Sequence, residues 1–281
     1  MKAWLDGQVL ESPERPAVSV LDHGLVVGDG VFETIAVVNG QPFAPTAHLL
    51  RLAKSAAGLG IGSPDLDLLR EGIAATLDGQ DLPFGRIRIT VTSGLGPLGS
   101  PRGAGPLTHV VITEPAERPP AVSSIVTVPW TRNERGALVG LKTTSYAENA
   151  LMVEYAKARG ASEAIMANTR GDLCEGTGSN IFYVVDGQLV TPTLESGCLA
   201  GVTRALALEW LGEELDVVER DAPIGVLREA DEVILVGTTR NIQAIGKVDD
   251  RELEAPGPVT RQAQQIWERR IVEDADPLHA W

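Results

Sequence analysis

Apolar residues along the first third of the chain fall into short runs separated by turn residues, a pattern that predicts strands and two helices. Val31–Val38 is rich in β-branched residues and ends at Asn39-Gly40, which is typical of a hairpin turn before a short strand at Gln41–Phe43. Leucines and alanines recur at helical spacing after Pro45, up to Gly58 and Gly60, and again over Leu66–Leu77, so both segments are predicted to be helices. Further strands are predicted over Trp4–Leu10, Val18–Leu21, Arg86–Thr92 and Leu107–Thr113.

The stretch 114–124, EPAERPPAVSS, contains three prolines and no periodicity, which is typical of an interdomain linker. It separates a predicted first domain, 1–113, from a second domain, 125–281. The second domain is predicted to hold strands over Ile125–Pro129, Glu163–Ala167, Asn180–Val185, Gln188–Thr191 and Asp231–Val236, and helices over Tyr146–Arg159, Val202–Leu211 and Thr260–Val272. This mixture indicates an α+β (mixed α/β) chain of two domains.

Composition and charge narrow the function classes. The net charge is −14, and the resulting field would repel nucleic-acid phosphates and anionic membranes. Cys174 and Cys198 show neither a disulfide framework nor a metal-binding spacing, so we expect no metal site and a reduced, cytoplasmic setting. The first ten residues lack the apolar core of a signal peptide, and no apolar run of membrane-spanning length occurs.

Residues 94–99 read GLGPLG, which matches the G-x-G-x-x-G pattern of dinucleotide-binding loops. That function requires a helix to begin at the loop, so that its N-terminal N–H groups meet the pyrophosphate. Here Ser100-Pro101-Arg102-Gly103 follows, and no helical pattern starts before the strand at Leu107. The segment is therefore interpreted as a Gly/Pro loop, or as a mobile loop over an active site, for which glycine hinges are suited.

Four segments carry candidate chemistry, although each has an ordinary structural interpretation. Arg51 lies between Leu50 and Leu52 on the first predicted helix, where a lone arginine is usually a solvated surface residue. Lys142, in LVGLKTTSY, follows an apolar run and precedes several hydroxyl residues. A buried lysine lowers its pKa readily and so suits imine chemistry, whereas an isolated strand-end lysine usually points to water.

The other two segments lie further along the chain. Glu175, in LCEGTGSNIF, is flanked by small residues and leads into an apolar strand. A glutamate there is either a solvated loop acid or the carboxylate that pairs with a pyridine nitrogen. Leu199–Arg204, LAGVTR, opens a helix whose N-terminus is either an ordinary helix start or a phosphate site, and Gly237-Thr238-Thr239 supplies more hydroxyl and N–H groups after a buried strand.

Taken together and in this order, the segments resemble the fold type IV enzymes that depend on pyridoxal 5′-phosphate (PLP), the class IV aminotransferase family. The resemblance extends from Asp22-His23-Gly24 and Gly28–Thr34 to Thr239, nearly the whole chain. The family includes D-amino-acid, branched-chain and R-selective amine transaminases and 4-amino-4-deoxychorismate lyase. The implied fold is a D-amino-acid-transaminase-like one, in which a small N-terminal α/β domain and a larger C-terminal domain enclose the cofactor.

The resemblance also implies roles for individual residues. Lys142 is similar to the Schiff-base lysine that moves the Cα proton, and Glu175 to the acid that pairs with the pyridine nitrogen. The remaining cofactor contacts that it implies are the phosphate-binding Arg51, Val202, Thr203, Thr238 and Thr239, the ring-packing Leu199, the pocket-lining Ser179 and Asn180, and Tyr146 near the phenolic oxygen. It further implies a homodimer in which each site borrows a loop of its neighbour near Asp22–Leu25, which makes His23 a substrate-binding candidate.

The substrate is less well specified. The usual D-amino-acid enzymes bind the α-carboxylate with a tyrosine in a G-D-G-V-Y-E motif and with an R-x-H motif, but this chain has Phe32 and Ser93–Gly96 at those positions. Arg86 and Arg88 alternate on one face of a predicted strand, and branched-chain enzymes have a pocket arginine matching Arg88. An arginine here could accept a carboxylate in a bidentate contact, unless both side chains face solvent. Because alternate residues of a strand share a face, we expect exposure to apply to both arginines or to neither.

We therefore expect a transaminase that moves an amino group from an amino acid, preferably a D-amino acid, to a 2-oxo acid such as 2-oxoglutarate or pyruvate. The alternative is aminodeoxychorismate lyase, which uses the same lysine and cofactor to give 4-aminobenzoate and pyruvate. Branched-chain and R-amine substrates are further alternatives. A PLP-binding protein without catalysis is disfavoured because Lys142, Glu175 and Arg51 are all in place.

Overall fold

The computed structural model describes residues 1–278, so the last three residues of the predicted second domain lie outside it. The chain forms two compact units. Unit 1 contains Met1–Arg118, the segment Leu141–Tyr146 and the described residues after Asp274, and unit 2 contains Pro119–Gly140 and Ala147–Asp274. Lys142 therefore belongs to the first unit, although it follows the predicted linker in sequence.

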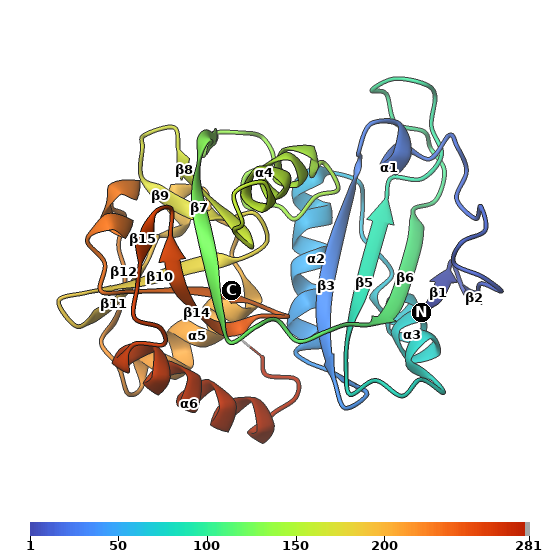
Figure 1. Ribbon diagram of the computed structural model, residues 1–281. Coiled ribbons are helices and arrows are strands. Elements are labelled where there is room, and N and C mark those ends of the chain that lie inside the picture. The colour runs from blue at the N-terminus through green and yellow to red at the C-terminus, as the bar shows by residue number, and fades with distance from the viewer. Residues whose placement is uncertain (279–281) are drawn as a thin grey trace. The chain divides into compact units, whose positions relative to one another are not determined.

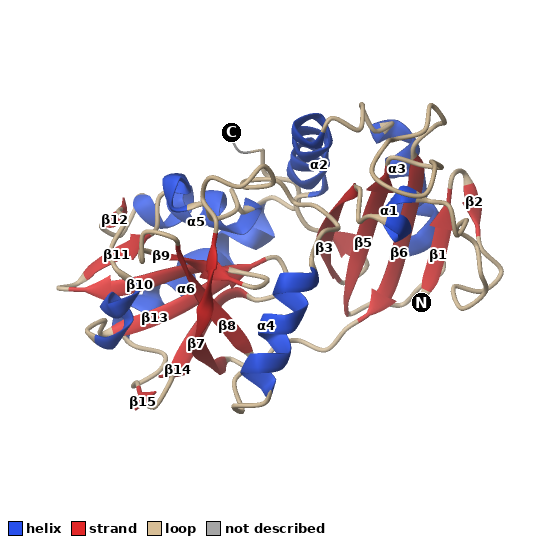
Figure 2. Cartoon of the chain, turned by 90° about the horizontal axis from the view of Figure 1, so that it is seen from above, coloured by secondary structure: helices blue, strands red, loops and turns tan. Residues whose placement is uncertain are grey.

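Unit 1 is built on one antiparallel sheet with the strand order β2-β1-β6-β5-β3-β4. Figure 2 shows β1, β6, β5 and β3 side by side. The strands are β1 (Lys2–Leu5), β2 (Gln8–Val9), β3 (Gly30–Val38), β4 (Gln41–Pro42), β5 (Phe84–Thr92) and β6 (Thr108–Pro115). The predicted hairpin at Asn39-Gly40 is confirmed, because β3 and β4 pair directly across it.

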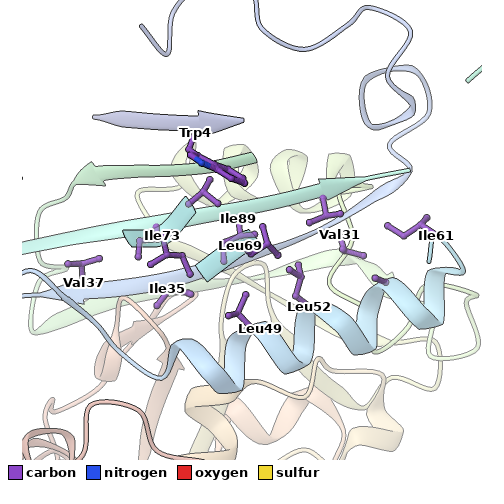
Figure 3. Close-up of a cluster of buried hydrophobic side chains, with 14 of the residues drawn as sticks. Trp4, Val31, Ile35, Val37, Leu49, Leu52, Ile61, Leu69, Ile73 and Ile89 are labelled. Carbon is purple, nitrogen blue, oxygen red and sulfur yellow. The ribbon is translucent and has the colours of Figure 1, made fainter. Parts of the chain in front are cut away.

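Two long helices cover one face of this sheet. Helix α2 (Pro45–Leu59) packs on β3, and α3 (Leu66–Leu77) packs on β6 and β1. Figure 3 shows Leu49 and Leu52 of α2 pointing at the sheet, with Ile35 of β3 among the fully buried side chains between them. The apolar period that predicted both helices therefore marks the side that is removed from water.

Residues at the two ends of α2 determine where the helix begins and where it stops. Pro45 occupies the first turn, and no side chain of the preceding residue caps the helix. Instead Asp276 accepts hydrogen bonds from the backbone N–H of Thr46 (2.9 Å) and from its hydroxyl (2.6 Å), which places a carboxylate at the positive helix end. Gly60 ends the helix with a left-handed φ of 72°, as the sequence predicts.

Two predicted strands of unit 1 are wrong. Trp4–Leu10 is not one strand but the hairpin β1–β2, because Asp6 and Gly7 both have positive φ (43° and 94°) and reverse the chain. Val18–Leu21 forms no strand. Its apolar side chains are exposed and have no neighbouring strand to pair with, and the chain instead turns into the short helix α1 (His23–Val26).

Unit 2 is built on a mixed sheet with the order β12-β11-β10-β13-β14-β7-β8-β9, and β15 pairs with β14. β7 runs parallel to both of its neighbours, β8 and β14. The strands are β7 (Val122–Arg132), β8 (Glu163–Asn168), β9 (Leu173–Gly176), β10 (Asn180–Val185), β11 (Gln188–Thr191), β12 (Val217–Glu219), β13 (Glu232–Gly237), β14 (Asn241–Val248) and β15 (Arg251–Glu252).

Helices cover this sheet. Helix α4 (Ala147–Lys157) packs on β8 and β7, beside which Figure 2 shows it, while α5 (Val202–Gly212) and α6 (Pro258–Glu273) pack on each other. Short 3-10 turns lie at Leu194–Ser196 and Ile224–Arg228. The mixed α/β fold class is thus confirmed. Over residues 1–278, no helix has the length and apolarity needed to cross a membrane.

Candidate active site

The segment that carries Lys142 is fixed along the free edge of β3. The Lys142 carbonyl accepts a hydrogen bond from the Phe32 N–H (3.0 Å), and the Lys142 N–H donates to Ser55 Oγ of α2 (3.1 Å). Gly58 makes this approach possible, since a Cβ there would lie 2.5 Å from the Leu141 side chain. Backbone contacts to β3 and α2 therefore fix the position of residue 142.

The Lys142 side chain belongs to a group that we call the Phe32 cluster: Phe32, Arg88, Lys142 and Tyr146. The Lys142 Nζ lies 4.3 Å from the centroid of the Phe32 ring, and the Arg88 Cζ lies 3.4 Å from the same centroid. The two cationic groups are therefore within about 8 Å of each other. The Tyr146 ring meets Phe32 edge-on at 5.1 Å. Four of the sequence-predicted residues are thus brought together in unit 1.

Arg86 and Arg88 share one face of β5, as predicted, but their surroundings differ. Arg86 pairs with Glu114 and its side chain is 53% exposed, so the expectation that both would be exposed or neither is wrong. The difference arises because Phe32 covers the face at Arg88 and does not extend to Arg86.

Arg88 is half-buried, and this burial lowers its pKa to about 10, which leaves the guanidinium charged at neutral pH. Its Nε donates to Thr90 Oγ1 (3.3 Å). Among residues 1–278, no carboxylate lies within ion-pair distance of it. Arg88 is therefore a cation that an external carboxylate could neutralise.

Arg51 lies on the buried side of α2 and not in solvent. Its Nε and one terminal nitrogen donate to the two oxygens of Glu33, each at 2.7 Å, and Glu33 is completely buried on β3. Burial opposes ionisation of Glu33, but Arg51 and His48 outweigh it and hold the pKa of Glu33 well below its usual range. Sequence reasoning named Arg51 but missed this partner.

His48 completes the buried group, which we call the Glu33 cluster: Glu33, His48 and Arg51. The Nδ1 of His48 lies 2.8 Å from Glu33 Oε2, and its Nε2 is buried with no hydrogen-bond partner in the described chain. Burial lowers the pKa of His48, so the ring is neutral. Because ionised Glu33 can only accept, Nδ1 must carry the proton.

Unit 2 holds Glu175 on β9. Its Oε2 accepts a hydrogen bond from the Leu199 N–H (2.9 Å), and its Oε1 lies 3.3 Å from a terminal nitrogen of Arg132. The carboxylate is thus oriented by a backbone donor and faced by a cation. Arg132 was missed from the sequence, since nothing in the spacing of β7 connects it with residue 175.

The residues around Leu199 gather beside Glu175. Asn180 donates through Nδ2 to the Leu199 carbonyl (2.9 Å), and a Cβ on Gly201 would lie 2.0 Å from Asn180 Oδ1. Gly201 precedes α5, whose N-terminus has no side-chain cap. Val202 and Thr203 form its first turn, so their N–H groups stand at the positive end of an uncapped helix.

Thr238 and Thr239 lie in the turn between β13 and β14. This turn lies next to Ser179: a Cβ added to Gly237, which precedes the turn, would be 3.9 Å from the Cα of Ser179. Buried Glu163 joins the two segments, because it accepts hydrogen bonds from Ser179 Oγ (3.3 Å) and Arg240 (3.1 Å). The sequence-predicted residues of unit 2 are therefore gathered, and Glu163 is a support that sequence reasoning missed.

His23 is placed differently from its prediction as a substrate contact. The ring is fully buried, and its Nε2 lies 2.8 Å from the Pro97 carbonyl of the GLGPLG loop. His23 therefore supports that loop. Arg102 also holds the loop, because it donates to Asp29 (2.6 and 2.7 Å) and to the Gly60 carbonyl (2.7 Å) at the end of α2. As predicted, no helix follows the loop.

Comparison with known proteins agrees with this arrangement. A model of the amino-transferase class IV family matches residues 30–248. A Methanocaldococcus jannaschii protein named as a branched-chain-amino-acid aminotransferase is 34% identical over 94% of both chains, and a Staphylococcus epidermidis D-alanine aminotransferase is 29% identical over 96% of this chain and 98% of its own. A Mycobacterium tuberculosis protein described as a hypothetical aminotransferase, in PLP-bound form, has a TM-score of 0.86 and 25% identity, with 98% of this chain and 100% of that chain covered. The chain therefore belongs to the class IV aminotransferases.

Proposed function

We propose that this aminotransferase takes its amino group from a D-amino acid, whose α-carboxylate Arg88 binds, and passes it to a 2-oxo acid. The observation that carries the proposal is the Phe32 cluster, where a half-buried, unneutralised arginine lies close to Lys142. An α-amino acid carries its amino nitrogen two bonds from its carboxylate carbon. A carboxylate held by Arg88 therefore leaves the amino group within reach of Lys142.

The enzymes of this family use PLP, and each unit, taken by itself, holds residues whose chemistry suits a part of that cofactor. The uncapped start of α5, with Thr203, suits a phosphate, because backbone N–H groups and the helix dipole favour an anion there. Glu175, held by the Leu199 N–H, suits a protonated pyridine nitrogen. When bound, PLP supplies an aldehyde for imine formation and a ring that withdraws electrons from Cα.

The chain's own residues then perform the remaining work. Lys142 would hold the aldehyde carbon of the cofactor, and its amine would serve as the base for the Cα proton of the amino acid. Glu175 would keep the ring nitrogen protonated. Arg88 would fix the carboxylate so that the Cα–H bond is directed at Lys142, which is an orientation effect. Arg51, Ser179, Asn180, Thr238 and Thr239 are proposed to complete the cofactor contacts.

The D-amino-acid preference draws support from the D-alanine aminotransferase relative, which matches almost end to end. Loop 93–96, which stands where those enzymes are expected to bind the carboxylate, is here held by backbone hydrogen bonds and offers no cation. Arg88 takes over that task in our proposal. A branched-chain L-amino acid is the second candidate, because the Methanocaldococcus relative carries that name.

A substrate screen tests the proposal. The PLP-loaded enzyme is mixed in turn with D-glutamate, D-alanine, L-leucine, L-valine and aminodeoxychorismate, and its visible absorption is followed. We expect D-amino acids to bleach the band and release the matching 2-oxo acid. Bleaching by L-leucine and L-valine alone would assign the branched-chain function instead. Turnover of aminodeoxychorismate alone, with release of pyruvate, would identify a lyase.

We further propose that the active form is a homodimer. Apolar side chains are unusually exposed on two loops of unit 1 and on helix α1, which follows the first loop: Val20, Leu98 and Leu25 are 75%, 78% and 69% exposed. The loops form one surface, since the Gly96 N–H donates to the Leu21 carbonyl (3.2 Å). Exposed apolar surface of this kind typically marks a protein interface. A second copy is the occupant that the family's borrowed loop implies.

Sedimentation should therefore return twice the chain mass of 29.8 kDa. Leu25→Asp/Leu98→Asp should shift the protein to monomer, because each introduced carboxylate would have to be desolvated at the interface. Val272→Asp, at an 82% exposed position on α6, is the matched control and should remain dimeric. A monomeric wild type, or an unchanged mass in the double variant, would contradict the proposal.

A further inference from the structure

The Glu33 cluster brings a carboxylate, an imidazole and a guanidinium together in the interior of unit 1. We propose that Glu33 is a positioning residue with two tasks: it fixes the plane of the Arg51 guanidinium, and its charge balances that of Arg51 close to Lys142. The inference rests on the proposed function only in assigning Lys142 and Arg51 to PLP. Taking these charges out of water is costly, so the pair is a candidate for a functional role beside Lys142.

The positioning task follows from geometry. Both oxygens of Glu33 bind Arg51 at 2.7 Å, through two different nitrogens, so the guanidinium plane is set by the carboxylate plane. Glu33 itself cannot move, because it is fully buried on β3 and His48 binds its Oε2. An arginine side chain has many rotamers, and this pair selects one of them before any ligand arrives.

The second task, balancing positive charge, follows from the charged groups near Lys142. Its backbone N–H is bound to Ser55, one helical turn beyond Arg51 on α2, and its side chain lies on Phe32, the residue next to Glu33. The groups that face Glu33 are Arg51 and His48 from α2. Arg88 of β5 lies on the other face of the sheet but also feels the charge of Glu33, and Lys142 acts on His48. His48 is neutral, so Glu33 is the one anion among these groups. Without it, uncompensated positive charge would disfavour a protonated nitrogen at Lys142.

Glu33→Gln tests the charge task. It keeps the shape of the side chain and removes its charge. A pH titration of the visible band of PLP bound through Lys142 should show its pKa fall by about one pH unit, because one compensating negative charge is lost. Glu71→Gln removes an equal charge from the exposed surface of α3 and should leave that pKa unchanged.

Glu33→Asp tests the positioning task, because it keeps the charge but is too short to reach both nitrogens of Arg51. The band should titrate as in the wild type, while PLP is retained roughly tenfold less tightly, as expected for one lost charge-assisted contact. Affinity for pyridoxal, which has no phosphate, should be unchanged.

Unaltered titration in Glu33→Gln would overturn the charge task, and unaltered PLP retention in Glu33→Asp would overturn the positioning task. The aspartate variant decides the second question even if the glutamine variant does not fold. A wild-type protein that shows no visible band with PLP would instead refute the role of Lys142. That outcome is separate from either result with the Glu33 variants.

Discussion

Replacing Lys142 with alanine should abolish the visible absorption of the PLP-loaded protein and lower transamination at least about 10⁴-fold. The loss is large because one amine serves both as the attachment point of the cofactor and as the base at Cα, and a positioned base alone contributes up to about 10⁴-fold. No other lysine is found in the Phe32 cluster to replace it. The measurement is the absorption spectrum after reconstitution, followed by the rate of 2-oxo acid release.

The fold should survive this substitution. Lys142 is held through its backbone N–H and carbonyl, which alanine retains, and its side chain is only half-buried. The thermal midpoint should therefore change by no more than a few degrees, since about 1 kcal/mol corresponds to about 2–4 °C in a chain of this size. Lys54→Ala, which alters an exposed lysine on α2, is the control and should keep both band and rate. A visible band that persists in Lys142→Ala would contradict the assignment.

Elements with strong periodicity were predictable from the sequence, because one buried face imposes the pattern. Leu66–Leu77 and Asn180–Val185 form with the predicted bounds. The absence of a strand at Val18–Leu21 was not predictable. Its apolar residues lie on the surface, so the apolar pattern there does not indicate burial. The strand Asn241–Val248 was overlooked because polar residues and Gly246 interrupt its apolar run, although the sheet buries it between β13 and β7.

For the site, the sequence indicated which side chains matter but not which of them touch. Glu33 and Arg51 are 18 residues apart on a strand and a helix, and no spacing rule connects them. A signal was present, however: an acid inside an apolar strand must find a cation, and His48 and Arg51 stand on the same helical face. Arg132 and Glu163 gave no such signal, because their partners, Glu175 on another strand and Ser179 in a turn, are brought to them only by the fold.

Replacing Arg88 with alanine should lower kcat/KM for D-amino acids about 10²–10³-fold, mainly by raising KM. Truncating one side of a buried charge pair costs about 2–5 kcal/mol, and each 1.36 kcal/mol corresponds to a factor of ten. The carboxylate would lose the guanidinium that lies over Phe32, while the cofactor attachment at Lys142 is untouched. Initial rates over a range of D-alanine concentrations, in the presence of saturating 2-oxo acid, provide the measurement.

Arg86→Ala provides the matched control, because Arg86 lies on the same strand and face but is 53% exposed and paired with Glu114. Screening by solvent leaves such a surface pair worth little, so KM should stay within about twofold of the wild-type value. A second control uses the substrate: 1-phenylethylamine has no carboxylate, so any slow turnover of it should be indifferent to Arg88→Ala. If KM for D-alanine does not change in Arg88→Ala, Arg88 does not bind the carboxylate. If the rates with the amine and with the amino acid fall together, Arg88 acts on the cofactor and not on the substrate.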